Sequence, residues 1–407
     1  MAVQIIENGG ITAPKGYLTG AVYAGIKSRK SYKPDVAVLL SDRQATVAAL
    51  FTTNRFCAAP VTLGRELLKK GVARGIVINS GNANAGTGAR GIEDAKAVAA
   101  FAERLLGLES GEMFVCSTGV IGEYLPVEKI QQAVEKIVPT LSPLAGSDAA
   151  WAIMTTDKAR KELAAELPLS GGTVRIGAMS KGSGMIHPNM ATTLTFLTTD
   201  AAVDRSLLQS LLRDACDRSI HLLTIDGDTS TNDSIFLFAN GASGVRVESE
   251  ADVEAFADAL NQICLAMAKK IAADGEGASR MMTVETRGLS TKETAAAVAR
   301  AVASSTSVKL ALGQGRLGWG EILTAVGNSA VECGDIAPDC AIRSPLGAVT
   351  LCENGLAAEG VESRLAQILS AAEVTVSLDF HQGDGCGLAY GCDLTDEYVR
   401  INGDYRS

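Results

Sequence analysis

The chain has 407 residues, of which 47% are hydrophobic and 20% are charged, and its formal net charge is -9. This composition excludes an intrinsically disordered chain, and an acidic balance without a basic run argues against nucleic-acid binding. The first residues lack the basic and apolar regions of a secretory signal, and no apolar run is long enough to cross a bilayer, so we expect a cytoplasmic protein without a membrane partner.

The cysteines and histidines do not form the pattern of a disulfide framework or a metal site. The nine cysteines are an odd number scattered from Cys57 to Cys392, and no Cys-x-x-Cys pair is present. The three histidines, His187, His221 and His381, are too few and too far apart in sequence for a histidine-rich centre. We therefore expect no bound metal.

The first half of the chain alternates short apolar runs with helical patterns. Val36–Leu40 and Thr46–Phe51 are apolar runs separated by a polar turn, which predicts antiparallel strands. Gly107 directly follows a helical pattern and is typical of a helix C-cap. Further strands are expected at Gly75–Asn79, Met113–Cys116 and Thr173–Ala178, and helices at Glu93–Leu106, Val127–Val138 and Asp148–Met154.

Two polar segments that follow these strands have both a structural and a functional interpretation. The turn-rich segment Ser80–Gly86 is equally consistent with a glycine-allowed connection and with a loop that lines a site. The segment Ser117–Gly119 has small residues after a strand, which expose backbone N–H groups as an oxyanion hole requires. A plain exit from a strand into a turn has the same pattern.

The second half of the chain mixes helices and strands without an internal repeat or a low-complexity linker. The only boundary that we predict is therefore a chemical one, after Ala191. Helices are expected at Arg205–Leu222, Ala251–Ala272, Thr291–Leu312 and Val361–Ala372, and strands at Thr192–Thr199, Ser234–Ala239, Met281–Thr286, Val374–Asp379 and Leu388–Ile401.

Two glycine-containing segments resemble ligand loops but fail the tests for them. Asp226–Asp233 begins like a calcium loop, but an EF-hand needs Gly and Glu where this chain has Thr231 and Leu237. We therefore predict a polar loop without a metal. Gly313–Gly318 matches the dinucleotide fingerprint, but it follows a helical pattern instead of a strand, so we predict no nucleotide site.

The stretch from Lys181 to Thr192 has the most distinctive chemistry. Glycines at positions 182 and 184 free the backbone, Pro188 restricts it, and a strand-like run begins at Thr192. If the bond after Ala191 were cleaved, Thr192 would carry a hydroxyl and a free α-amine, whose pKa of about 7.7–8 allows it to accept the hydroxyl proton. The stretch is thus compatible with a nucleophile that carries its own base, but a loop of this composition that leads into a Thr-rich strand is most often only a loop and a strand.

Lys181-Gly-Ser-Gly-Met185 followed by Pro188-Asn-Met-Ala-Thr192 closely resembles the self-cleavage site of the ornithine acetyltransferase family, the glutamate N-acetyltransferases of arginine biosynthesis. The resemblance implies an α/β layered sandwich of β-sheets flanked by helices, of the N-terminal-nucleophile-like autoprocessed type. It also implies an alpha chain of residues 1–191 and a beta chain of residues 192–407, assembled as an α2β2 heterotetramer. Other family-like stretches follow in order at Phe51–Arg55, Asn79–Asn84, Ser117–Gly122, Met154–Asp157, Asp226–Asp233, Gly275–Ala278, Gly391–Thr395 and Tyr405–Ser407.

The same resemblance implies a role for individual residues. Thr192 would be the nucleophile, and the oxyanion hole would consist of the Thr118 hydroxyl and the Gly119 backbone N–H. A lysine with a hydroxyl donor suits a substrate carboxylate, and a glutamate suits a substrate ammonium. The substrate-binding residues implied by the family are Thr155, Lys181, Thr192, Glu276, Asn402 and Ser407, and cleavage would occur between Ala191 and Thr192.

The implied reaction is a ping-pong transfer of acetyl from N2-acetylornithine to glutamate through an acetyl ester of Thr192. No bound cofactor is expected. Use of acetyl-coenzyme A varies within the family, so it is expected at most as a co-substrate. One alternative is an autoprocessed N-terminal-nucleophile amidase or aminopeptidase on the same scaffold. Another is a binding protein without catalytic activity, which would remain one chain.

The sequence departs from the family most clearly at Arg316–Glu321. The family usually has Asp-Pro-Asn-Trp-Gly-Arg there, whereas this chain has Arg-Leu-Gly-Trp-Gly-Glu. We expect this change of charge to affect the substrate range or a subunit contact more than the chemistry of the nucleophile.

Overall fold

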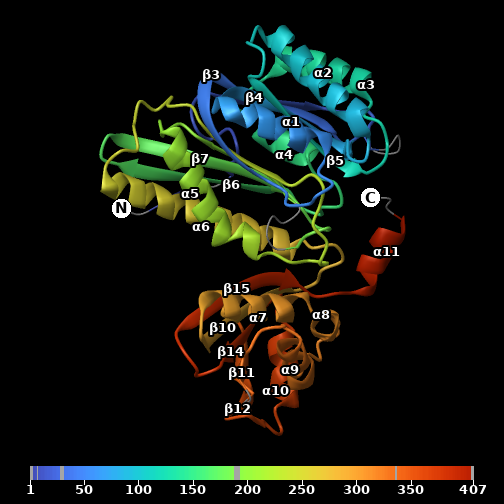
Figure 1. Ribbon diagram of the computed structural model, residues 1–407, viewed down its shortest axis with the longest axis vertical. Helices are drawn as coiled ribbons and strands as arrows, with labels where there is room; N and C mark the ends of the chain where they lie inside the picture. Colours follow the sequence, from blue (N-terminus) through green and yellow to red (C-terminus); the bar gives the residue numbers. More distant parts are fainter. Residues whose placement is uncertain (1–2, 7, 28–31, 188–192, 335–336, 405–407) are drawn as a thin grey trace.

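In its described residues, the computed structural model has one β-sheet of nine strands and one of six, both packed against helices (Figure 1). It describes residues 3–6, 8–27, 32–187, 193–334 and 337–404. The nine-stranded sheet spans residues 4–239, and the six-stranded sheet spans residues 281–392. The chain is thus a mixed α/β protein of stacked sheets and helices, as predicted.

The nine-stranded sheet has the order β1-β6-β7-β8-β9-β3-β4-β5, with β2 paired to β3. The pairs β4–β5 and β8–β9 are parallel, and the other pairs are antiparallel. The strands are β1 (Gln4–Ile6), β2 (Tyr17–Val22), β3 (Val36–Phe51), β4 (Val72–Asn82), β5 (Met113–Val120), β6 (Lys161–Leu169), β7 (Gly172–Lys181), β8 (Leu194–Thr199) and β9 (Ser234–Ala239).

Strand β3 divides this sheet into two layers that pack against each other. Its first part pairs with β2 and β4, its last part pairs with β9, and the register shifts between Leu40 and Ala45. One core cluster contains side chains from β4 and β5 together with side chains from β7, β8 and β9. At its centre the ring of Phe114 meets that of Phe236 edge-on, with centroids 5.0 Å apart. The two strands predicted here are therefore two parts of one bent strand.

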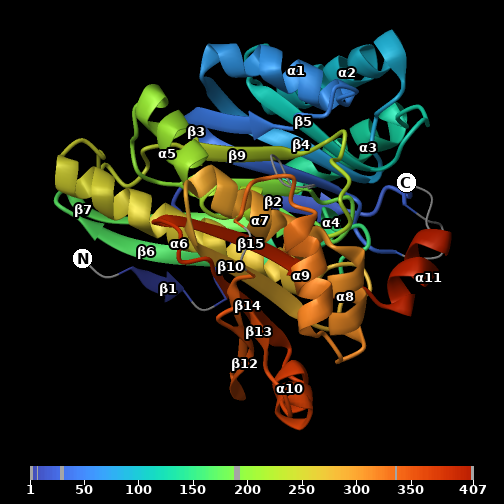
Figure 2. The ribbon, with the colours of Figure 1, turned by 60° about the horizontal axis from the view of Figure 1, so that its bottom comes forward.

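Helices cover the outer side of both layers (Figure 2). Helices α2 and α3 pack on the β3–β5 layer, whereas α5 and α6 pack on the layer that contains β6–β9. Helix α2 ends at Gly107, whose φ of 64° is the left-handed conformation expected of a C-cap. The bounds are α1 (Ala59–Leu67), α2 (Gly88–Leu106), α3 (Val127–Ile137), α4 (Gly146–Ala152), α5 (Arg205–Asp217) and α6 (Glu250–Ala273).

The six-stranded sheet has the order β13-β12-β11-β14-β10-β15, and α7 to α10 pack on one of its faces. The strands are β10 (Met281–Leu289), β11 (Asp339–Ser344), β12 (Gly347–Glu353), β13 (Leu356–Ala357), β14 (Glu373–Asp379) and β15 (Gly385–Cys392). The helices are α7 (Lys292–Ser304), α8 (Thr306–Gly313), α9 (Trp319–Gly327) and α10 (Glu362–Leu369).

Several predicted elements differ in extent from the observed ones, and three of them run past a cap or a turn. Leu388–Ile401 is not one strand, because β15 ends at Cys392 and Asp396–Asp404 forms helix α11. Thr291–Leu312 is not one helix, because Ser305 ends α7 and its hydroxyl accepts a bond from the Val308 N–H at the start of α8. Helix α5 ends at Asp217, five residues before the predicted end, and a short 3-10 turn follows. In each case a polar cap or turn interrupts an apolar pattern that continues past it.

The departure from the family pattern, Arg316–Glu321, lies at the start of α9. The carboxylate of Glu321 accepts a hydrogen bond of 3.2 Å from the Gly318 N–H, and the Arg316 side chain lies 3.9 Å from the same carboxylate. A carboxylate in the first turn stabilises a helix. The glutamate therefore has a local structural role in the six-stranded part of the chain.

Candidate active site

A cavity of about 130 Å³ lies where the ends of β5 and β7 meet the loop Asp226–Asn232, which precedes β9, and the turn between α6 and β10. Helix α11 closes one side of it. The proposed nucleophile Thr192, its neighbour Ala191 and the terminal Ser407 lie outside the described residues. The cavity is lined by six of the site residues named from the sequence: Thr118, Gly119, Thr155, Lys181, Glu276 and Asn402.

Gly119 is required by a close approach of two strands. Its φ is 133°, and a Cβ atom there would lie 2.3 Å from the carbonyl carbon of Gly81 in β4. No larger residue fits without moving the backbone of β4. The packing of β5 against β4 thus fixes the backbone N–H of Gly119 near the end of β5, where it lines the cavity.

The hydroxyl of Thr118 is oriented by a buried lysine. Thr118 is 8% exposed, and its Oγ1 lies 3.3 Å from the Nζ atom of Lys181. An ammonium group only donates, so the hydroxyl oxygen accepts this bond and its own hydrogen stays available to donate. Thr118 and Gly119 can therefore supply two donors to one oxyanion in the cavity.

Lys181, the last residue of β7, is only 4% exposed. Burial lowers the pKa of its ammonium, and the negative charges of Asp157, Asp233 and Glu276 oppose this effect. Asp157 also accepts a bond of 2.8 Å from the Gly182 N–H and contacts Lys161 at 2.6 Å. Burial alone would raise the pKa of Asp157, but Lys161 and Lys181 outweigh it and lower that pKa to about 2. Asp157 therefore stays ionised beneath the cavity.

Replacement of Asp157 by Asn is expected to lower the free energy of unfolding by about 3 kcal/mol at neutral pH, because it leaves the buried Lys161 with less counter-charge. The native pKa is depressed below its ordinary value, so the stabilisation is complete above about pH 4 and is lost as the pH falls towards 2. Urea unfolding at pH 7 and pH 3 measures the difference, with the exposed Asp258→Asn as control. An equal deficit at both values would contradict the assignment.

Glu276, in the turn between α6 and β10, is one of three carboxylates that line the cavity, together with Asp226 and Asp228. It is 7% exposed, and its Oε2 accepts a hydrogen bond of 2.7 Å from the side-chain amide of Asn402 in α11. A Cβ at Gly184 would lie 2.4 Å from the same carboxylate, so this glycine makes room for it. A buried cation and a buried carboxylate in one cavity suit a ligand that carries both charges, such as an amino acid.

The turn-rich segment Ser80–Gly86 is both a connection and a support for the site. Ala83 lines the cavity, and its carbonyl accepts a bond of 2.6 Å from the Asn232 amide. The same amide also donates to the Ser117 carbonyl, at 2.8 Å. Asn232 thereby holds the end of β5 against the segment Asp226–Asp233, which lies at the site as the polar loop that the sequence predicts.

Sequence reasoning missed some of the lining residues. Tyr398 in α11 lines the cavity, but its segment was predicted as a strand, so its face was not assigned. Met185 and Ile121 were not singled out either. The acidic pair Asp396 and Glu397 at the start of α11 is the sequence signal for a helix that could have placed Tyr398.

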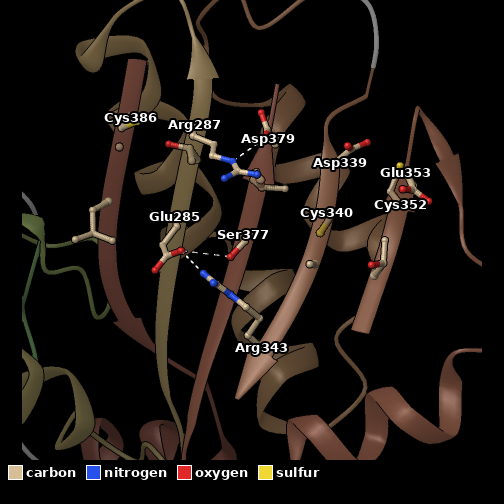
Figure 3. A pocket seen from close by; sticks show the side chains of 16 residues that line it. Glu285, Arg287, Asp339, Cys340, Arg343, Cys352, Glu353, Ser377, Asp379 and Cys386 are labelled. Carbon is tan, nitrogen blue, oxygen red and sulfur yellow. Dashed lines mark hydrogen bonds and ion pairs between the residues drawn. The ribbon is translucent and has the colours of Figure 1, made fainter. Parts of the chain in front are cut away.

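A larger groove, of about 570 Å³, lies on the face of the six-stranded sheet opposite the helices α7 to α10 (Figure 3). Four of its charged side chains pair with each other: Arg343 contacts Glu285, and Arg287 contacts Asp379 at 2.7 Å. The Arg343 and Glu285 side chains are 50% and 46% exposed. Both arginines of the groove are thus already paired with carboxylates, and none of the site residues predicted from the sequence lines it. We therefore place the candidate active site in the smaller cavity.

The part of the chain that the structure describes holds neither of two other kinds of site. There, no three His, Cys, Asp or Glu side chains come together as metal ligands would. Within the same residues, no helix combines the length and the apolar character of a membrane span.

Comparison with known proteins places the chain in a known group. The family model described as "ArgJ family" matches residues 18–407. The chain is 44% identical over 401 residues to the arginine biosynthesis bifunctional protein ArgJ of Symbiobacterium thermophilum, with 98% of this chain and 99% of the relative covered. It is 41% identical over 404 residues to the protein of the same name from Caldanaerobacter subterraneus, with 99% and 100% covered.

The solved structures that it resembles include the ornithine acetyltransferase of Mycobacterium tuberculosis complexed with ornithine. That chain is 35% identical, has a TM-score of 0.43, and matches 46% of this chain and 99% of its own length. The argJ protein of Bacillus halodurans is 32% identical, with a TM-score of 0.43, and matches 47% of this chain and 98% of its own length.

Proposed function

The chain belongs to the ArgJ family of arginine-biosynthesis acetyltransferases, and on this premise we propose that it moves acetyl from N2-acetylornithine to glutamate through an acetyl ester of Thr192. One observation carries the proposal: the cavity combines the donors of Thr118 and Gly119 with the buried charges of Lys181 and Glu276. Both substrates have an α-carboxylate that suits Lys181. The δ-ammonium of N2-acetylornithine, whose α-nitrogen carries the acetyl group, suits Glu276.

Self-cleavage comes first in this proposal. The hydroxyl oxygen of Thr192 attacks the carbonyl carbon of Ala191, the peptide C–N bond breaks, and the freed α-amine takes the hydroxyl proton. Water then hydrolyses the ester and leaves chains of residues 1–191 and 192–407. Strand β8 follows the cleaved bond and begins at Leu194, which pairs with Lys181 at the cavity. The new chain end would thus be produced next to the substrate-binding residues.

Acetyl transfer uses the same hydroxyl. The α-amine of Thr192 accepts the hydroxyl proton while the oxygen attacks the acetyl carbonyl of N2-acetylornithine. Thr118 and Gly119 donate to the resulting oxyanion. Collapse breaks the acetyl C–N bond, the α-amine returns the proton to ornithine, and Thr192 keeps the acetyl group as an ester. The amine of glutamate then attacks the carbonyl carbon of this ester, and the bond from the acetyl carbon to the Thr192 oxygen breaks. A proton of the attacking amine passes through the α-amine of Thr192 to that oxygen, so N-acetylglutamate leaves and the hydroxyl is regained.

The two chains would stay together after cleavage. Strands β7 and β8 flank the cleaved bond and are neighbours in one sheet, paired from Ile176–Thr199 to Lys181–Leu194. We propose that two alpha and two beta chains form a heterotetramer in the cytoplasm. We also propose that acetyl-coenzyme A is a second acetyl donor, which the word "bifunctional" in the names of the relatives supports.

Transfer of labelled acetyl from N2-acetylornithine tests the reaction. With glutamate present, we expect the label in N-acetylglutamate, and without glutamate we expect only about one label per active site to be retained by the protein. Label that appears entirely in acetate would instead support the amidase or aminopeptidase. Lack of any transfer by a chain that remains whole would support the binding protein.

A further inference from the structure

The carboxylate of Asp226 holds the backbone of the segment that leads to the proposed cleavage site. It accepts hydrogen bonds from the N–H groups of Met185, at 2.5 Å, and Ile186, at 2.8 Å. A weaker bond of 3.3 Å comes from the Asp228 N–H in its own loop. The two donors on consecutive residues make this a clamp on the peptide backbone.

The clamped segment is fixed on its other side as well. The carbonyl of Ile186 accepts a bond of 2.8 Å from the Ile225 N–H, and its side chain is fully buried in the core beneath α5 and α6. His187 contacts the Thr224 hydroxyl at 3.4 Å. Residues 185–187 therefore run beside residues 224–226.

The clamp also holds an unfavourable backbone conformation. Met185 has a φ of 57°, in the left-handed region that non-glycine residues rarely occupy. Such a conformation persists only where neighbouring groups enforce it. The bond from the Met185 N–H to Asp226 is the contact that enforces it here, in a segment that Gly182 and Gly184 would otherwise leave flexible.

Helix α11 lies close to the same carboxylate. Tyr398 and Asp226 both line the cavity, and burial together with the charge of Asp226 raises the pKa of the Tyr398 hydroxyl. Asp226 thus joins the segment before the cleavage site to the loop after the 3-10 turn at Ile220–Leu222, in a cavity that α11 closes on one side.

We propose that Asp226 is a positioning residue for self-cleavage, which directs the chain into the scissile bond by clamping the backbone of Met185 and Ile186. This inference rests on the proposed function. Ordering a residue costs about 1–2 kcal/mol, so a clamp that orders this segment before the reaction removes that cost from the barrier to attack. The ionised carboxylate is needed, because only it accepts from all of these donors at once.

The rate of self-cleavage should depend on pH, because the proposed clamp needs an ionised Asp226. Burial raises the pKa of this carboxyl, the hydrogen bonds from Met185, Ile186 and Asp228 lower it, and the charge of Glu276 raises it, with a raised pKa as the net result. The other titratable groups close to it are Asp228, Tyr398 and Cys392. Protonation weakens the clamp, so the rate of cleavage should fall as the pH falls through the raised pKa of Asp226.

The experiment follows the full-length chain after a pulse of cell-free synthesis, on denaturing gels, at a series of pH values. We expect Asp226→Asn to slow the splitting about 10- to 100-fold and to lose the acidic limb of the profile. The matched control is Asp252→Asn, which removes a buried carboxylate that accepts from the Ser170 N–H, at 2.8 Å, on a different part of the molecule. This control should split at the wild-type rate.

A second variant keeps the inference testable if Asp226→Asn does not fold. Tyr398→Phe removes a hydroxyl that lines the cavity with Asp226 and whose pKa the charge of Asp226 raises. Without this polar neighbour the pKa of Asp226 should rise, and the acidic limb should move to higher pH. An Asp226→Asn chain that folds and splits at the wild-type rate overturns the inference, and so does a Tyr398→Phe profile that does not move. Failure of the wild-type chain to split overturns the proposed function itself, so the two failures are distinguishable.

Discussion

Replacement of Thr192 by alanine is expected to leave the 407-residue chain whole and to abolish acetyl transfer. The variant lacks the only hydroxyl that, in the proposed mechanism, attacks both the Ala191 carbonyl and the acetyl group. Loss of a nucleophile that acts together with its base lowers the rate by about 10⁴-fold or more. Mass spectrometry of the purified chain and the labelled-acetyl assay measure the two effects.

The neighbouring threonine provides the matched control. Thr193 is buried, its hydroxyl accepts a bond of 3.1 Å from the Thr195 hydroxyl, and its carbonyl accepts from the Ser234 N–H. Thr193→Ala removes a hydroxyl of the same kind one residue further on, and it should still split and transfer acetyl. Active wild-type enzyme in which Thr192 remains joined to Ala191 would contradict the mechanism.

Replacement of Thr118 by valine is expected to lower kcat about 10²- to 10³-fold with a much smaller change in KM. Valine has nearly the shape of threonine, so β5 should keep its place, but one oxyanion donor is lost. The reduction falls on kcat because the donor meets a full negative charge only in the tetrahedral intermediate. Steady-state kinetics with N2-acetylornithine and glutamate measure both constants.

Thr118→Ser keeps the hydroxyl and should retain most of the activity, which separates hydrogen bonding from packing. Because the Thr118 oxygen also accepts a bond from Lys181, the valine variant leaves that buried ammonium with one partner fewer. A valine variant with unchanged kcat and a raised KM would assign Thr118 to ground-state binding of the substrate instead.

The clearest match between sequence and structure lies in the segments whose pattern is local. Ser234–Ala239 is an uninterrupted apolar run and forms β9 with the predicted bounds, because a strand buried on both faces needs no alternation. Helix α2 ends at Gly107 because only a residue free to adopt positive φ fits there. The pattern failed where a cap interrupts it, as at Ser305, and where α11 follows β15 after a short turn.

The candidate site likewise has residues that the sequence could name and contacts that it could not predict. The motif from Lys181 to Thr192 indicates an autoprocessed threonine, and the resemblance to the family names the residues that could accompany it. Their meeting in one cavity was not derivable from spacing, since Thr118, Glu276 and Asn402 belong to three separate parts of the chain. The proposed role of Asp226 depends on hydrogen bonds between elements that no motif links.

The sequence by itself determined the class of the protein, the majority of its buried strands and helices, and the chemistry that a threonine at position 192 could perform. These follow from side-chain periodicity and from the properties of single residues, which act over a few positions. Two features depend on the tertiary structure. Strand β3 belongs to both layers of the nine-stranded sheet, which pack against each other, and β5, β7 and α11 supply residues to one cavity. This is because the pattern of apolar residues in a sequence predicts which face of a helix or strand is buried, but it does not predict which distant element packs on that face.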